Sequence, residues 1–179
     1  TKMTSGFPRP STTKYGSSSV KIYLLPVSFS DYKFTSSDKK LYEDNFKKVQ
    51  MFFSQQSYGR FKPEFIFPPE SDWLSVSGDI RSYDLENTFA QQTKVQAAKD
   101  IFSSVPANLD LTKYDGVIIA TPFYRETGGA EAFLGQNLLT KNGEVTNAMM
   151  IYGRGLSSWS TIAHEMGHAI FGLEDLYLF

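Results

Sequence analysis

The chain of 179 residues contains no cysteine and only two histidines. The absence of cysteine excludes disulfides and a cysteine nucleophile, and it leaves the redox compartment undecided. The 18 basic residues balance 19 acidic ones and are scattered along the chain, so we expect no binding to nucleic acid. The longest apolar runs are only strand-sized, so we also expect no membrane span.

Both histidines fall in one short motif, His164-Glu165-Met166-Gly167-His168. Residues four apart lie on one face of a helix, about 6 Å apart along its axis, so both imidazoles can bind one metal ion. Glu165 then lies where its carboxylate can reach a metal-bound water rather than the metal. This is the H-E-x-x-H pattern of zinc peptidases, which predicts His164 and His168 as zinc ligands and Glu165 as general base. The alternative is a chance occurrence of two surface or core histidines.

The residues around the motif predict a helix that has one buried face. Apolar residues recur there at helical spacing: Ile162, Ala163, Met166, Ala169 and Ile170. Serines at 157, 158 and 160 offer N-cap side chains, and Gly172 offers a left-handed stop. Burying two histidines and a glutamate without partners is costly, and a bound metal removes that cost.

The rest of the chain predicts an α/β fold. We expect strands over 20–25 (ended by Pro26), 64–67, 74–76, 116–120 and 148–152, and helices over 38–57 and 90–105. The continuously apolar strand 116–120 should be central and covered on both faces. Glycines at 128, 129 and 135 predict a flexible or tightly turned loop. Residues 1–19 are rich in Ser, Thr, Gly and Pro and predict a flexible arm before a domain over 20–179.

Several segments resemble the immune inhibitor A-type family of secreted bacterial metallopeptidases, which belongs to the metzincin-like zincins. They are Val27-Ser28-Phe29-Ser30-Asp31, Gln56-Ser57-Tyr58-Gly59-Arg60-Phe61, Tyr114-Asp115-Gly116-Val117-Ile118-Ile119, Ala163-His164-Glu165-Met166-Gly167-His168 and Gly172-Leu173-Glu174-Asp175-Leu176-Tyr177. The resemblance implies a twisted mixed β-sheet with two backing helices and an active-site helix that carries two zinc ligands. It also implies a zinc endopeptidase that acts on a protein or peptide substrate, secreted from or displayed on a bacterial cell.

The third zinc ligand is where the chain departs from that family. Metzincin-like sites place a glycine three residues after the second histidine and a His or Asp ligand six residues after it. Here Phe171 takes the glycine position and Gly172 follows one residue late. Counting from Gly172 selects Asp175 as the ligand, because a glycine turn directs the chain that follows. Counting from His168 selects Glu174, and a third alternative makes both carboxylates surface or calcium-binding groups. No calcium-loop pattern occurs, so calcium stays unassigned.

The ends of the chain bear on the same question. The sequence begins at Thr1 and stops at Phe179, so we expect a processed protein or a fragment that lacks the C-terminal subdomain of such enzymes. In that case a third ligand could lie beyond Phe179. Met149 and Met150 are expected to fill core space rather than to form a methionine turn beneath the zinc.

Two alternatives to a peptidase remain at this point. One is a non-catalytic zincin-like surface, adhesive or virion structural module, and the other is a cytosolic metal-dependent hydrolase of small substrates. The strand 148–152 is either an edge strand that receives an extended peptide or an ordinary strand of the sheet. Tyr152 and Tyr177 could donate to an oxyanion, but we do not assign them to catalysis.

Overall fold

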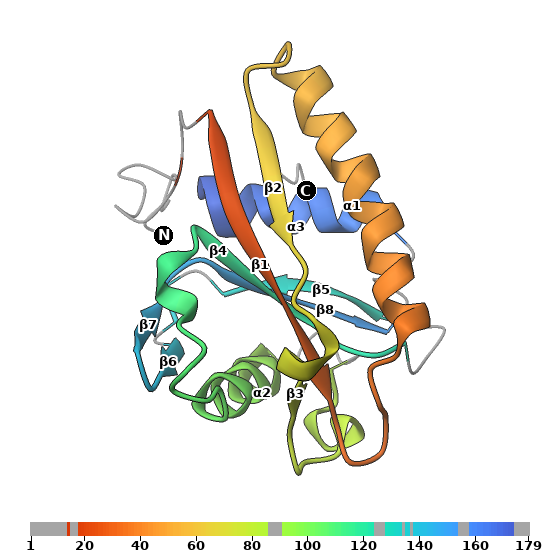
Figure 1. Cartoon of the computed structure of the whole chain (residues 1–179), viewed down its shortest axis with the longest axis vertical. Helices are drawn as coiled ribbons and strands as arrows, with labels where there is room; N and C mark the ends of the chain where they lie inside the picture. Colours follow the sequence, from red (N-terminus) through yellow and green to blue (C-terminus); the bar gives the residue numbers. More distant parts are fainter. Residues whose placement is uncertain are drawn as a thin grey trace, which may run out of the picture.

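The fold is α/β, and its described residues form a mixed sheet with three α-helices, as the order of predicted elements indicates (Figure 1). We describe it from a computed structural model, over residues 14, 18–85, 91–123, 128–133, 135–136, 138–153 and 158–173. Three parallel strands form the centre of the sheet: β1 (Ser19–Ser28), β4 (Gly116–Ala120) and β8 (Ala148–Gly153).

Three more strands complete this sheet. β2 (Lys62–Ile66) runs parallel to β1, β3 (Leu74–Ser75) pairs with the end of β1, and β5 (Gly128–Ala132) runs antiparallel to β8. The strand order is β2-β1-β4-β8-β5, so β5 is the edge strand on its side among the described strands. A separate two-stranded sheet joins β6 (Leu138–Thr140) to β7 (Gly143–Val145).

The helices cover both faces of the main sheet. α2 (Gln91–Ser103) packs on one face, whereas α1 (Ser36–Gln56) and α3 (Trp159–Phe171) pack on the other. Alternate residues of each central strand point to opposite faces. In β8, for example, Met150 joins the cluster under α2, and Met149 joins the cluster under α1 and α3. The two expected backing helices therefore lie on opposite faces, and both methionines fill core space as predicted.

The central strand prediction is confirmed, because all five residues of β4 are buried. The glycine loop predicted at 128, 129 and 135 is wrong at the first two positions, because residues 128–132 form β5, whereas Gly135 lies in a turn with φ of 68°. Local glycine content indicates a turn, but pairing with β8 supplies backbone hydrogen bonds that outweigh the weak strand preference of glycine. An edge role for the strand 148–152 is also wrong: β8 lies inside the sheet, between β4 and β5.

Pro26 was expected to end the first strand, but it lies inside β1. One side of β1 pairs first with β2, as far as Tyr23, and then with β3, from Val27 onward. The Ser28 carbonyl faces this side, because it accepts from Val76 N–H. Backbone groups alternate in direction along a strand, so Pro26 faces the same side as Ser28, in the gap between β2 and β3. The missing N–H of proline therefore removes no bond of the sheet.

The start of α1 is tied to the carboxyl ends of the central strands. Thr35 and Asp38 form a capping box, and a carboxylate oxygen of Asp38 also accepts from Phe123 N–H at 2.9 Å. The buried hydroxyl of Tyr42 shares its one proton between the carbonyls of Thr121 (3.2 Å) and Ile151 (3.3 Å). These contacts hold the ends of β4 and β8 against α1.

Most of the expected N-terminal arm lies outside the described residues. Lys14 is described, and its backbone N–H donates to the Ile170 carbonyl at 2.7 Å while its Nζ lies 2.9 Å from an Asp115 carboxylate oxygen. At this residue the arm contacts the last turn of α3.

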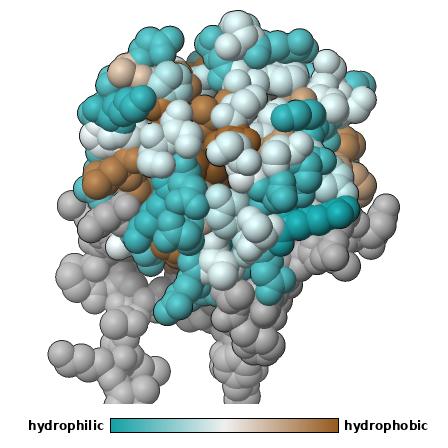
Figure 2. Space-filling model, turned by 90° about the horizontal axis from the view of Figure 1, so that it is seen from below, coloured by the Kyte–Doolittle hydropathy of each residue, from teal (hydrophilic) through white to brown (hydrophobic). Residues whose placement is uncertain are grey.

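Among the described helices, none is long and apolar enough to cross a membrane. The face drawn in Figure 2 is mostly hydrophilic, and its hydrophobic side chains lie in separate small areas.

Candidate metal centre

α3 carries the motif, and its ends are those that the sequence predicts. Ser158 is the N-cap, and its Oγ accepts from Thr161 N–H at 3.4 Å. Gly172 is the C-cap in the left-handed conformation, with φ of 62°. The buried side of α3 packs on the sheet through Ile162, Met166 and Ile170, which leaves the two histidines on a more accessible side.

His164 and His168 come together as the four-residue spacing predicts. Their Nε2 atoms lie 3.1 Å apart, and their ring planes are inclined at 84° with centroids 4.6 Å apart. Zinc–nitrogen distances and a tetrahedral angle place two ligating nitrogens about 3.3 Å apart. The pair therefore fits two positions of a tetrahedral zinc site with little movement of either ring. Without a metal, the same short distance is a hydrogen bond from one Nε2–H to the other Nε2.

The turn that ends α3 orients His168. Gly172 N–H donates to the His168 carbonyl at 2.9 Å, and Leu173 N–H donates to the Gly167 carbonyl at 3.0 Å. The bond from Gly172 to His168 is the one that defines an αL C-cap, which requires the left-handed residue that Gly172 provides. It places the Leu173 carbonyl 2.5 Å from Nδ1 of His168. With Nδ1–H donating to that carbonyl, Nε2 of His168 carries the lone pair that a metal needs.

Sequence reasoning did not identify the Leu173 carbonyl as a functional group. The sequence did contain a signal for it, because a glycine after an apolar helix predicts a left-handed C-cap and thus the place of the next carbonyl. No residue type marks the position, since the group that acts belongs to the backbone.

Glu165 is half-buried on α3, next to His164. Burial raises the pKa of Tyr152, and the charges of Glu131 and Glu165 add to this rise while Lys94 opposes it. Tyr152 itself packs in the cluster on the α2 face of the sheet, opposite to α3, which does not favour it as an oxyanion donor. Tyr177 lies outside the described residues.

The third ligand is the part of the centre that the geometry does not supply. Within the described ranges, no three His, Cys, Asp or Glu side chains converge as a metal-binding group. Asp175 and Glu174 both lie outside those ranges. The helix does end at Phe171 with Gly172 as the turning residue, which is the premise for counting from Gly172. The assignment of Asp175 stays a prediction.

The chain matches neither a model of a known protein family nor any curated protein.

Proposed function

We propose that this chain is a zinc-dependent endopeptidase with a metzincin-like zincin domain. The observation that carries the proposal is the convergence of two histidine Nε2 atoms to 3.1 Å, with His168 oriented through its other nitrogen by the Leu173 carbonyl. A structural metal site does not require a carboxylate next to its first ligand, whereas hydrolysis requires a general base at that position. Glu165 at that position therefore favours the enzyme over the non-catalytic module.

The roles of the side chains follow from their chemistry. His164 and His168 would hold zinc as neutral imidazoles, with Asp175 as the proposed third ligand. Zinc bound by three protein ligands supplies Lewis acidity and lowers the pKa of a bound water to about 7. The carboxylate of Glu165 would take the proton as water attacks a peptide carbonyl, and would then give it to the departing amine. Calcium has no assigned site.

The edge strand that would receive the substrate is β5 rather than β8. α3 packs against β5, and Ala130 and Ala132 of this strand contact the cluster on the α3 face. Because β5 ends the sheet among the described strands, its outer edge offers backbone groups to an extended peptide. A peptide paired there would run beside the helix that carries Glu165. With such a substrate, the site of action would be outside the cell or on its surface, as the family resemblance implies.

The proposal is tested by zinc content and by peptide cleavage measured on the same samples. We expect about one zinc per wild-type chain, as one tetrahedral site predicts, and cleavage of an unstructured peptide mixture that stops on chelation. The variants His164→Asn and His168→Asn should each lose both properties. The chain has no histidine besides these two, so wild-type zinc content in both variants would show binding elsewhere and contradict the proposed site. Zinc bound by the pair in a wild-type chain that cleaves no peptide would favour the non-catalytic module.

A further inference from the structure

A buried ion pair joins α2 to the edge strand β5. Lys94 is 4% exposed, and its Nζ lies 3.1 Å from Oε2 of Glu131. The amide of Gln91, one turn earlier on α2, donates to Oε1 of Glu131 at 3.3 Å. Both oxygens of this carboxylate are therefore held by the same helix.

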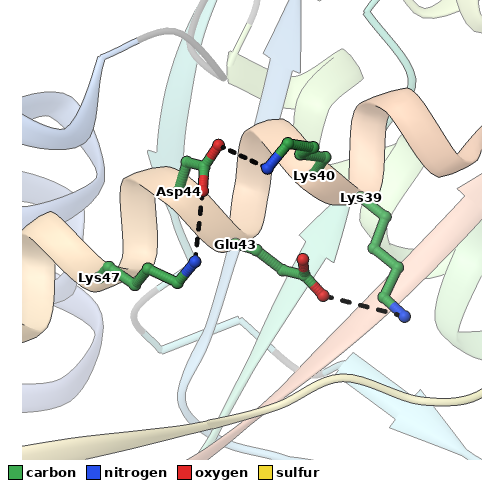
Figure 3. Close-up of polar contacts among 5 residues, drawn as sticks. All are labelled: Lys39, Lys40, Glu43, Asp44 and Lys47. Carbon is green, nitrogen blue, oxygen red and sulfur yellow. Dashed lines mark hydrogen bonds and ion pairs between the residues drawn. The ribbon is translucent and has the colours of Figure 1, made fainter.

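This pair differs from the ion pairs on the outer face of α1. Figure 3 shows Lys40 and Lys47 around Asp44, and Lys39 beside Glu43, all within one helix. The Lys40 side chain is 74% exposed, and exposed pairs of this kind add little to stability. The Lys94–Glu131 pair connects α2 to β5, and both of its side chains are largely shielded from solvent. Such buried pairs add little net stability, but they can select one arrangement over others.

Tyr152 extends the contact from α2 to β8. Lys94 Nζ lies 5.5 Å from the centroid of the Tyr152 ring. Tyr152 is paired directly with Gly129 of β5, and a β-carbon at Gly129 would lie 3.4 Å from the tyrosine hydroxyl. Burial acts to lower the pKa of Lys94, but its hydrogen bonds and charge interactions with Tyr152 and Glu131 outweigh this and raise it. The lysine therefore stays charged and bound to both strands.

The sequence of β5 does little to fix its own register. It reads Gly128-Gly129-Ala130-Glu131-Ala132, so Glu131 is its only large side chain. Strands rich in glycine pair in weakly specified registers, and a slip of one residue turns every side chain to the other face. Glu131 is now opposite Met150, on the α2 face. After a slip of one residue it would point to the α3 face, and Lys94 would stay buried without its carboxylate, which is costly.

We propose that Lys94 and Glu131 set the register of β5 against β8, and so determine which backbone groups this edge presents beside α3. The first part depends only on the pairing of the two strands. The second part rests on the proposed function, in which a peptide pairs with β5. Lys94 acts here as a positioning residue, since it touches the strand and not the substrate.

The register is measured by nuclear magnetic resonance on the whole chain. The probes are cross-strand nuclear Overhauser contacts of Gly129 with Tyr152 and of Ala130 with Ile151, together with hydrogen exchange of the β5 amides. The variants are Lys94→Met and the double variant Lys94→Met/Glu131→Leu, which leaves no unpaired charge and should keep the melting temperature near that of wild type. Lys40→Met removes a lysine from an exposed pair and is the control.

In both variants we expect loss of the wild-type cross-strand contacts and exchange of the β5 amides that is faster by about tenfold or more. The amides of β1 and β4 should keep their wild-type exchange rates, and Lys40→Met should change nothing. Wild-type contacts and exchange in the double variant would overturn the proposal. Equal acceleration in β1, β4 and β5 would also overturn it, because the pair would then act on the whole fold.

Peptide cleavage tests the second part separately. In a chain that cleaves a long peptide, the double variant should distribute its cuts over neighbouring bonds, because the edge no longer has one register. Cleavage at the wild-type bonds alone would overturn this part. Failure of the wild-type chain to cleave any peptide would instead contradict the proposed function, while the register measurement would still decide the first part.

Discussion

Gly116, the first residue of β4, lies directly against Ile170 in the last turn of α3. A β-carbon built on Gly116 would be 2.5 Å from Cδ1 of Ile170 and 3.3 Å from the Asn147 carbonyl oxygen. The absence of a side chain at this one position lets the C-terminal half of α3, which includes His168, approach the central strand closely.

The close contact predicts a coupling between the two residues. Gly116→Ala should lower the free energy of unfolding by about 1–3 kcal/mol, because the added methyl group overpacks the contact. Ile170→Val removes Cδ1, so its usual cost of about 0.5–1.5 kcal/mol should fall or vanish when Gly116→Ala is already present. Chemical denaturation of the two single variants and the double variant gives this coupling. If the free-energy changes of the two single variants simply add in the double variant, the proposed coupling is contradicted.

Glu165→Gln should separate chemistry from metal binding. The amide keeps the shape of the side chain but cannot accept a proton, so we expect peptide cleavage to fall by about 10²–10⁴-fold. Zinc content should remain that of wild type, because Glu165 is not a proposed ligand. Glu144→Gln, at an exposed position of β7, is the matched control and should keep full activity. Loss of zinc from Glu165→Gln would instead make Glu165 part of the metal site.

Zinc analysis should distinguish Asp175 from Glu174. Counting from Gly172 predicts that Asp175→Ala lowers zinc content sharply, while Glu174→Ala leaves it near one per chain, because zinc needs a third protein ligand. The opposite result would transfer the ligand role to Glu174. Zinc that is absent or weakly held in the wild-type chain, and indifferent to both changes, would contradict both assignments.

Gly172→Ala should weaken zinc binding through the backbone. An alanine in the left-handed conformation costs about 1–2 kcal/mol, and release of this strain would displace the Leu173 carbonyl from His168. We expect zinc affinity to fall by about 10–100-fold, the usual effect of losing a partner that orients a ligand. Gly135→Ala introduces the same strain at another glycine with positive φ, where the added methyl group has open space. Calorimetric titration with zinc should show wild-type affinity for this control.

Tyr42 predicts a loss of stability at alkaline pH. Burial, and then the charge of Asp38, hold the pKa of Tyr42 well above its ordinary value of 10.0 in the folded chain. The unfolded chain therefore releases this proton first. The stabilisation is complete below pH 10 and is lost as pH rises above 10 towards the folded pKa.

Tyr42→Phe should lower stability by about 1 kcal/mol at neutral pH, because the hydrogen bonds to two backbone carbonyls are lost. It should also make the decline above pH 10 shallower. Urea denaturation at a series of pH values measures both effects. Tyr58→Phe, at a side chain that is 91% exposed, is the control. An equal alkaline decline in Tyr42→Phe and wild type would show that Tyr42 does not cause it.

The helix that carries the motif, its glycine C-cap, a serine N-cap from three candidates and the meeting of the two histidines could all be predicted from the sequence. These depend on interactions within about one or two turns of chain: a four-residue spacing, a serine before the helix and a glycine after it. The central strand 116–120 was also predictable, since a strand covered on both faces must be apolar throughout.

Features that depend on partners distant in sequence could not be predicted in this way. Residues 128–132 have the composition of a turn, and only pairing with β8 makes them the edge strand beside α3. Pro26 stays within β1 because its position falls in the gap between two neighbouring strands. Lys94 looks like any lysine of an amphipathic helix until the fold brings it to Glu131, 37 residues later. Local sequence sets conformational preference, whereas burial and strand pairing depend on which distant residues come into contact.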